Sequence, residues 1–577
     1  MNKRWLTMPP QERDAEDLAK DLGVSALLAQ LLIHRGLTSL EEARRFLRPE
    51  LSDLHDPRLL PGLDRGLDRL IEALQAGENI LIFGDYDVDG VTSVSLLMHL
   101  LKPLAGGKVY YYVPKRLEEG YGLSLEAIKR AAAQGISLIL TADCGISACA
   151  EVAAAGGLGL DVIVTDHHEP GEKLPEAVAV INPKMHGSRY PFSGLAGVGV
   201  AFKLGQALME RGLLAANDLW RRLDLVALGT IADVVPLLDE NRILVHHGLM
   251  QLNKTEHPGL RALLEAVQLH EKTVTAGQVG YVLAPRLNAS GRIGDASAGV
   301  KLLLTREAQR GRDLAQAIEH ENEERQRIEA RVLAEALIMI KEQVDLANEH
   351  ALVLASPSWH AGVIGIVASR LVDLYHRPVI LIALDEQEGR GSGRSIPGFN
   401  LYQGILSCAR YLERFGGHEA AAGLTVSRER LADFTREFTA MARAEIAASM
   451  LQPTLKIEAE INLAEANLGL ARELMLLAPF GSGNPAPVLA SRSLKPVDLR
   501  TIGENGKHLK IRVMQQGILR NAIGFSLGGC LPEIKAADRV DLAFMLEENT
   551  FNGNTDVQLN LKDIICPSQG ERLHAAE

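Results

Sequence analysis

Short apolar runs alternate with helix-like segments over residues 61–240, and this alternation limits the fold more than any other feature of the sequence. The runs are NILIFGDYD, KVYYYVP, SLILTAD, DVIVTDHH and AVAVINP. Segments such as LEAIKRAAAQG and SACAEVAAAGG have the apolar spacing of helices. Strand–helix–strand alternation predicts a mostly parallel sheet covered on both faces. Such a sheet binds ligands beyond the carboxyl ends of its strands.

The chain has 577 residues, which predicts several domains rather than one core. Residues 1–60 show helical patterns, and 61–300 contain the alternating region. Residues 301–350 include a long charged segment without Gly or Pro, which predicts one connecting helix, either solvated or partner-binding. Residues 351–450 form a second, smaller α/β pattern. The short alternating segments of 451–577 predict a small β-barrel.

Composition excludes several classes of protein. The formal net charge is −12, which argues against a wholly basic nucleic-acid binder but allows a local basic groove. No apolar run approaches the roughly 18–20 residues of a membrane-spanning helix, and the N-terminal residues lack a signal-peptide pattern. Five scattered cysteines without a CxxC pair fit a reducing compartment. We therefore expect a cytoplasmic protein without a membrane partner.

Acids and histidines follow several of these apolar runs. Because the carboxyl ends of parallel strands share one edge of a sheet, we expect the groups to meet there. A further acid follows the apolar stretch LGTIAD. A single aspartate at such a place is equally well explained as a helix cap or turn residue, but successive clusters are not. The residues are Asp85, Asp87 and Asp89, then Asp143, then Asp166, His167 and His168, and finally Asp233.

Carboxylates this close repel one another, and several could not remain ionised together. Divalent cations remove the repulsion. Aspartates with a minority of histidines suit Mn²⁺ well and Mg²⁺ plausibly. Two ions about 3.5–4 Å apart would form a hydrolytic centre. GVGVAF over 197–202 lacks the third glycine of a dinucleotide fingerprint and predicts a tight helix start.

The motifs DYDVDG, TADCG, TDHH and GTIADVVPL resemble those of the DHH phosphoesterase superfamily. Within it, VPKRLEEGYG, APRLNASGRIGDA, SWHAGVIGIVASRL, GSGRS, FGGHEAAAG and LLAPFGSGNPAP resemble the RecJ family of single-strand-specific exonucleases, from about residue 30 to 565. The resemblance implies an enzyme that degrades single-stranded DNA from its 5′ end to 5′-mononucleotides with two Mn²⁺ or Mg²⁺ ions. It also implies a DHH catalytic domain over 61–300, a DHH-associated substrate-binding domain over 351–450 and an OB-like nucleic-acid-binding domain over 451–577.

The resemblance also assigns roles to the clustered residues. It makes Asp87, Asp89, Asp143, His167 and Asp233 catalytic metal ligands. His168 either ligates a metal or hydrogen-bonds the scissile phosphate, and Asp85 lies at or just behind the ions. Some members of the superfamily carry a metal-binding histidine before the first motif, where this chain has Phe83 and Gly84.

A second set of residues is assigned to the substrate. Ser392 and Arg394 in GSGRS look like a Gly-flanked turn that could grip a phosphate. The resemblance implies that these two residues, together with Arg116, contact the 5′-terminal phosphate. For a single Arg or His in such loops, a salt bridge between domains is the alternative. The other predicted substrate contacts are Tyr121, Arg286, Asn288, Arg292, His360 and His418.

The predicted barrel carries a local basic stretch. Residues 485–520 contain seven Lys or Arg against Asp498 and Glu504. This pattern fits either a strand-binding face or an ordinary solvated one. Aromatic residues make up only 4% of the chain, so we expect contacts to phosphates more than to bases.

Two other functions compete with the exonuclease. The first is a small-substrate DHH phosphatase or pyrophosphatase, and the second is a catalytically silent nucleic-acid-binding relative. The resemblance implies a role in DNA repair and recombination beside a helicase and single-strand-binding protein.

Overall fold

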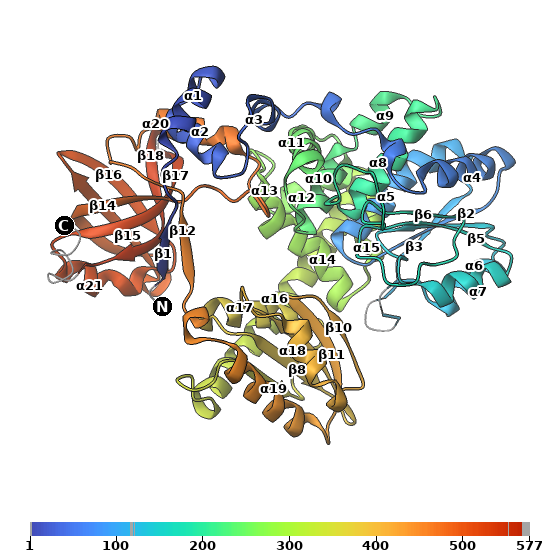
Figure 1. Ribbon diagram of the computed structural model, residues 1–577. Helices are drawn as coiled ribbons and strands as arrows, with labels where there is room; N and C mark the ends of the chain where they lie inside the picture. The colour runs from blue at the N-terminus through green and yellow to red at the C-terminus, as the bar shows by residue number, and fades with distance from the viewer. Residues whose placement is uncertain (1–2, 116–118, 121, 552, 568–577) are drawn as a thin grey trace. The chain divides into compact units, whose positions relative to one another are not determined.

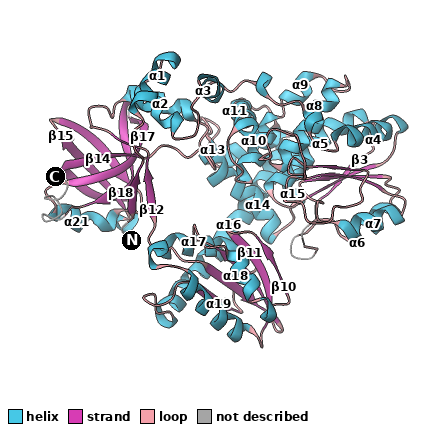
Figure 2. Cartoon of the chain, viewed as in Figure 1, coloured by secondary structure: helices cyan, strands magenta, loops and turns pink. Residues whose placement is uncertain are grey.

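The computed structural model describes residues 3–115, 119–120, 122–551 and 553–567, and divides into two compact units. The large unit comprises residues 50–451 and 481–483. The split unit comprises 1–49, 452–480 and 484–577, so it joins the two ends of the chain. Figure 1 colours the chain by residue number, and Figure 2 distinguishes helices from strands. Among the described residues, no helix combines the length and apolar character needed to cross a membrane.

A five-stranded parallel sheet of order β3-β2-β4-β5-β6 lies at the start of the large unit. Its strands are β2 (Ile80–Gly84), β3 (Val109–Tyr112), β4 (Leu138–Ala142), β5 (Asp161–Thr165) and β6 (Ala179–Ile181). All five predicted strand runs are therefore confirmed, together with the parallel sheet.

Alternate residues of each strand face opposite sides of this sheet, and both sides are buried. Ile80 and Ile82 pack with α4 (Leu63–Ala76), α5 (Val88–Leu104) and α8 (Gly197–Glu210). Leu81 and Phe83 pack with α6 (Leu125–Ala133) and α7 (Cys149–Gly157). Because strand side chains alternate with period two, continuous apolar runs are what a doubly covered sheet requires.

A helical layer follows the sheet. A π-helical turn (Val279–Leu283) joins α13 to α14, so residues 276–293 form one continuous helix. The 36-residue helix α16 (Ala308–Gln343) confirms the long connecting helix. The other helices are α9 (Ala216–Trp220), α10 (Leu223–Ala232), α11 (Asp239–Leu252), α12 (Pro258–Ala266), α13 (Ala276–Gln278), α14 (Ala284–Ile293) and α15 (Ser297–Leu304).

The large unit also contains a mixed sheet of order β10-β11-β9-β8-β7. Its strands are β7 (Leu352–Ser356), β8 (Val379–Leu384), β9 (Glu388–Arg394), β10 (Arg414–Gly417) and β11 (Ala421–Ser427), with helices α17 (Ile364–Tyr375), α18 (Leu401–Ser407) and α19 (Leu431–Glu445). The expectation of a turn at GSGRS is wrong. Residues 388–394 pair with β8 on one side and β11 on the other, so hydrogen bonding in the sheet outweighs the turn preference of glycine.

The split unit contains a closed barrel of β14, β15, β16, β18 and β17, in which β14 and β17 pair to complete the ring. This confirms the predicted OB-like barrel. Its strands are β14 (Leu489–Ile502), β15 (His508–Gln515), β16 (Ile518–Gly524), β17 (Val540–Phe551) and β18 (Asn554–Ile565), and β13 (Ala459–Glu460) pairs in parallel with the start of β14. Helices α20 (Leu468–Leu474) and α21 (Leu531–Ala536) accompany it.

The N-terminal residues belong to this same unit. Helices α1 (Glu12–Leu22), α2 (Ala26–Ile33) and α3 (Leu40–Leu47) lie where the sequence predicts helices. The sequence does not predict β1 (Arg4–Thr7), which pairs in parallel with β12 (Thr454–Ile457). Beyond α2, Arg35 donates to Glu458 Oε2 at 2.6 Å and to Asn484 Oδ1 at 3.1 Å. Both charged side chains of this ion pair are less than 10% exposed.

Arg35→Ala should destabilise the split unit by about 3–5 kcal/mol, because it leaves the Glu458 carboxylate buried without its cation. Arg472→Ala is the matched control, since its pair with Glu548 lies in the same unit and is exposed, so it contributes little. Urea unfolding followed by the fluorescence of Trp5, with Trp220 and Trp359 replaced by Phe, reports on this unit alone. Equal unfolding midpoints for the two variants would contradict the role of Arg35.

Candidate metal centre and phosphate site

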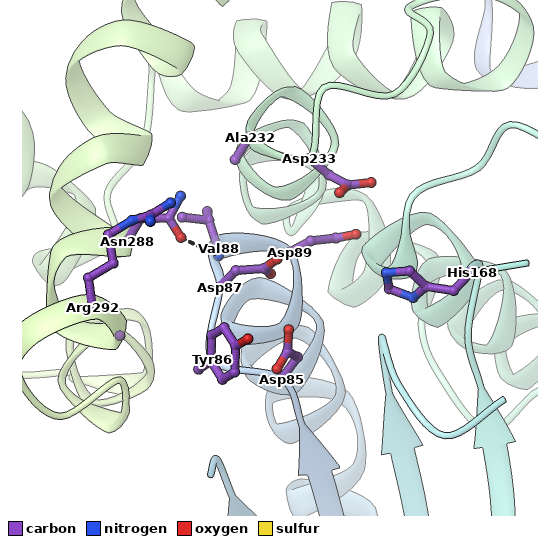
Figure 3. A pocket seen from close by; sticks show the side chains of 11 residues that line it. Asp85, Tyr86, Asp87, Val88, Asp89, His168, Ala232, Asp233, Asn288 and Arg292 are labelled. Atoms are coloured by element: carbon purple, nitrogen blue, oxygen red, sulfur yellow. Dashed lines mark hydrogen bonds between the residues drawn. The ribbon is translucent and has the colours of Figure 1, made fainter. Parts of the chain in front are cut away.

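The carboxyl edge of the parallel sheet gathers the acids that the sequence places there. Asp85 to Asp89 follow β2, Asp143 follows β4, and Asp166 to His168 follow β5. Asp233 lies at the carboxyl end of α10. Figure 3 shows Asp85, Asp87, Asp89, Asp233 and His168 around one space. The structure therefore brings together all seven predicted metal and catalytic residues.

His167 lies among three carboxylates. Its Nε2 atom is 3.1 Å from Asp143 Oδ1, 3.5 Å from Asp233 Oδ2 and 3.8 Å from Asp89 Oδ2. Three overlapping triplets have ligand atoms within 4.8 Å of one another. They are Asp143, His167 and His168; Asp89, His167 and Asp233; and Asp85, Asp87 and Asp143. Because the second and third triplets have no residue in common, the cluster suits more than one cation.

The amino end of α8 holds Asp89 in place. The backbone N–H groups of Gly197 and Val198 donate to its two carboxylate oxygens at 2.6 and 2.8 Å. A Cβ atom on Gly197 would lie 2.5 Å from Asp143 Oδ1, so only glycine fits here. The sequence correctly predicts a helix start at GVGVAF, but it does not reveal this role, because the contact joins residues more than 100 positions apart.

Asp166 positions His168. Its Oδ1 atom accepts hydrogen bonds from His168 Nδ1 at 2.8 Å and from the backbone N–H groups of His167 and His168. Its Oδ2 atom accepts from the N–H of Ile146 at 2.9 Å. With Nδ1 donating to Asp166, His168 directs Nε2 elsewhere, as metal- or phosphate-contacting histidines do. The sequence places Asp166 in the cluster without giving it this role.

Burial and mutual repulsion raise the pKa values of the acids. Burial, followed by the charges of Asp89 and Asp87, raises the pKa of Asp143 well above the usual aspartate value. Burial and Asp87 raise the pKa of Asp89 to about 7, and burial and Asp89 raise the pKa of Asp233 to about 9. Protons relieve this repulsion, and divalent cations can replace those protons.

The two histidines shift in opposite directions. Burial, together with the charge of His168, lowers the pKa of His167 to about 3, so its ring is neutral and able to ligate a metal. Burial also lowers the pKa of His168, but the hydrogen bond and charge of Asp166 outweigh it and raise the pKa to about 9. The oxygen and imidazole donors fit Mn²⁺ or Mg²⁺.

The acids line a pocket of about 310 Å³ that α14 closes on one side. Asn288 and Arg292 of α14 line it, as the sequence predicts for substrate contacts (Figure 3). Asn288 Oδ1 accepts from the N–H of Val88, which anchors α14 to the first turn of α5. The lining is completed by Tyr86, Val88, Ala232 and Gly291, which the sequence does not single out as site residues.

Ser392 and Arg394 meet the amino end of α17. A Cβ atom on Gly365, in the first turn of α17, would lie 2.8 Å from Ser392 Oγ and 3.0 Å from an Arg394 guanidinium nitrogen. An Arg292 guanidinium nitrogen lies 3.2 Å from the carbonyl oxygen of Gly362, just before α17. Helix amino ends with an adjacent guanidinium attract anions. A candidate phosphate site therefore lies close to the acidic pocket, with the Arg292 side chain between the two.

The remaining predicted substrate contacts lie on several different elements. His360 lies before α17 and accepts from the N–H of Gly362 through Nδ1 at 3.1 Å. His418 lies in the turn before β11, whose first residue pairs with Arg394. Arg286 forms a two-pronged ion pair with Glu319 of α16, so its guanidinium also ties α14 to α16. Arg116 and Tyr121 lie outside the described residues.

Comparison with protein families identifies three regions. Residues 79–230 match the DHH family N-terminal domain, residues 348–444 match the DHHA1 domain, and residues 457–563 match the RecJ OB domain. The first match contains every metal-cluster residue except Asp233, and the second contains Ser392 and Arg394.

Whole-length relatives agree with these matches. The single-stranded-DNA-specific exonuclease RecJ of Bacillus subtilis is 38% identical over 562 residues, which cover 97% of this chain and 70% of that protein. The enzyme of the same name from Dickeya dadantii is 40% identical over 561 residues, which cover 93% of this chain and 96% of that protein.

Solved structures give the same result. The crystal structure of Thermus thermophilus RecJ in complex with Mn²⁺ has a TM-score of 0.84 and 32% identity, and the match covers 98% of this chain and 80% of that one. A complex of the same protein with Mg²⁺ has a TM-score of 0.78. With matches over nearly the whole chain at up to 40% identity, the chain belongs to the RecJ family.

Proposed function

We propose that this chain is a metal-dependent exonuclease that degrades single-stranded DNA in the 5′-to-3′ direction and releases 5′-mononucleotides. The observation that carries the proposal is the set of three overlapping ligand triplets at the carboxyl edge of the sheet. Two Mn²⁺ or Mg²⁺ ions would activate water and neutralise charge on the scissile phosphate. Asp85, Asp87, Asp89, Asp143, His167, His168 and Asp233 are the residues that would hold them.

The chain's own residues prepare the pocket for a phosphodiester. The α8 amino end fixes both oxygens of Asp89, and Asp166 fixes the ring of His168. Arg292 and Asn288 line the opposite wall, where a cation and an amide can orient phosphate oxygens. In the alternative in which His168 contacts the scissile phosphate and does not ligate a metal, its imidazolium, with a pKa of about 9, can hold a proton near the substrate at neutral pH.

The polarity would come from the phosphate site at α17. A terminal phosphate monoester carries more negative charge than an internal phosphodiester, so a helix amino end with Arg394 and Ser392 favours a phosphorylated end. Because Arg292 links the acidic pocket to the segment before α17, a held 5′ phosphate would set which phosphodiester reaches the acids. This arrangement supports the release of short products from the 5′ end.

The barrel supports binding of single-stranded DNA. Arg500 of β14 and Lys510 of β15 lie directly opposite one another, although like charges at such positions destabilise a sheet. Arg492 is paired with Glu460 and Asp541, and Arg512 with Asp498, so the effective basic face is smaller than the sequence suggests. Neighbouring cations of this kind suit a strand held by its phosphates.

Cellular partners are inferred from this activity. A single-strand exonuclease needs the two strands of a duplex to be separated. A helicase would separate them, and a single-strand-binding protein would cover the exposed strand. We infer a role in DNA repair and recombination in the cytoplasm. The barrel and the family membership argue against a small-substrate phosphatase. The intact acid cluster argues against a catalytically silent relative.

Asp143→Asn should lower kcat on 5′-labelled single-stranded DNA in Mn²⁺ by about 10³-fold or more, since an amide replaces a carboxylate common to two ligand triplets. Asp68→Asn is the control, because Asp68 forms only an exposed pair with Arg211. Product analysis by denaturing gel or chromatography gives rate and polarity together. Near-normal turnover by Asp143→Asn would exclude the proposed centre.

Arg394→Ala should raise KM for 5′-phosphorylated single strands about 10–100-fold and reduce the preference over 5′-hydroxyl ends, because a charged hydrogen bond is worth about 1.5–3 kcal/mol. Arg390→Ala tests the same strand without the phosphate site, since Arg390 faces Glu388 and is mostly exposed. The measurement is the ratio of kcat/KM for the two kinds of end. An unchanged ratio in Arg394→Ala would place the grip elsewhere.

A further inference from the structure

Two strongly exposed apolar side chains lie on the segments that also carry residues of the acidic pocket. Among the large hydrophobic residues that the structure describes, Tyr281 and Val234 have the greatest exposure, at 88% and 67%. A single exposed apolar residue on a surface needs no explanation, but the two largest values in one neighbourhood do. Val234 directly follows Asp233 of the metal cluster, and Tyr281 precedes α14 in the same continuous helix.

Packing between α10 and the π-helical turn brings the segments that carry the two residues together. A Cβ atom on Gly280 would lie 3.7 Å from Ile231 Cγ2, so the segment carrying Tyr281 packs against the last turn of α10. The N–H of Val234 donates to the carbonyl of Ile231 in that turn. We call Val234 and Tyr281 the apolar ledge.

Both residues sit in unusual backbone. Val234 has a φ of 63°, which a β-branched residue adopts only under strain. Tyr281 lies in the π-helical turn, a feature that occurs frequently at functional sites. Neither conformation buries its side chain. The positive φ at Val234 and the π-helical turn at Tyr281 therefore contribute nothing to the core and leave both side chains exposed.

The distance to the pocket fits a nucleotide. Asn288, which lines the acidic pocket, follows Tyr281 by seven residues in the continuous helix, or about 10 Å at about 1.5 Å per residue. A strand whose phosphate reaches the acids would thus bring a neighbouring base close to Tyr281. Tyrosine rings stack on every base, because each base has a π face.

We propose that the apolar ledge holds the base of a nucleotide near the scissile phosphate, with Tyr281 as the stacking surface. This inference rests on the proposed exonuclease function. It makes Tyr281 a positioning residue for single strands: a stacked base must be unpaired, so the ledge disfavours duplex ends. It also adds a contact to a base to the phosphate contacts that the aromatic-poor sequence leads us to expect.

The test uses the full-length protein, Mn²⁺ and 5′-phosphorylated single strands that carry one abasic residue at each of the first six positions in turn. The variants are Tyr281→Ala, Tyr281→Phe and the control Tyr110→Ala, which removes another exposed tyrosine, on β3. Tyr281→Ala should raise KM about tenfold, equivalent to about 1.4 kcal/mol, with kcat nearly unchanged. Tyr281→Phe should stay within about twofold of wild type, because the ring suffices for stacking.

The abasic scan separates stacking from a general loss of affinity. In wild type, one abasic position should raise KM by about the same factor as Tyr281→Ala, and the two changes together should add little. The inference is overturned if the KM of Tyr281→Ala equals that of Tyr110→Ala, or if Tyr281→Phe raises KM as much as Tyr281→Ala does. It is also overturned if no abasic position raises KM more than the other positions do. If wild type leaves single strands intact, the proposed function and the ledge both fail; if wild type is active, only the ledge is at issue.

Discussion

Repulsion among buried carboxylates is the constraint on which this structure depends. Asp85, Asp89 and Asp143 are almost completely buried, and Asp233 and Asp87 lie beside them in the same pocket. The polypeptide offsets only part of the repulsion, through the N–H groups of α8 and the neutral ring of His167. Protons or cations must offset the remaining repulsion. A polypeptide does not keep such an arrangement for stability, so the cluster is best explained by the ions that it would bind.

The helices around the cluster are built to approach it closely. Four of them carry a glycine where a side chain would collide with the acid-bearing segments: Gly90 of α5, Gly197 of α8, Gly229 of α10 and Gly291 of α14. A Cβ on Gly229 would lie 2.9 Å from Asp89 Oδ1, and one on Gly291 would lie 2.6 Å from the carbonyl oxygen of Tyr86. Close backbone approach thus brings α10 and α14, with Asp233 and Arg292, to the sheet edge.

The metal cluster could be predicted because its signal is local. Every acid except Asp233, which follows helix α10, comes directly after an apolar strand, and parallel strands end at one edge, so the topology rule brings these acids together without any knowledge of distances. The positioning of Asp89 by Gly197 could not be predicted in this way, since backbone N–H groups leave no trace in residue type. The strand at Ser392 and Arg394 was also hidden, because its glycines suggest a turn while its pairing partners lie elsewhere in the sequence. The pairing of β1 with β12 joins residues about 450 positions apart, which no local pattern reveals.

The central claim is that the acid cluster is a cation site, and thermal unfolding across pH with and without Mn²⁺ tests it most directly. The aspartate pKa values are raised in the folded state, so the metal-free protein binds more protons than the unfolded chain and its stability should fall as pH rises. In a chelator, the melting temperature should therefore drop between about pH 7 and about pH 9, the range that the pKa values of about 7 and about 9 define and in which the lowered pKa of His167 no longer opposes the drop. Mn²⁺ should raise it by an amount that grows with pH, because the ions replace protons already lost. A melting temperature in chelator that does not fall over this range, with no added stability from Mn²⁺ at its upper end, would contradict the account.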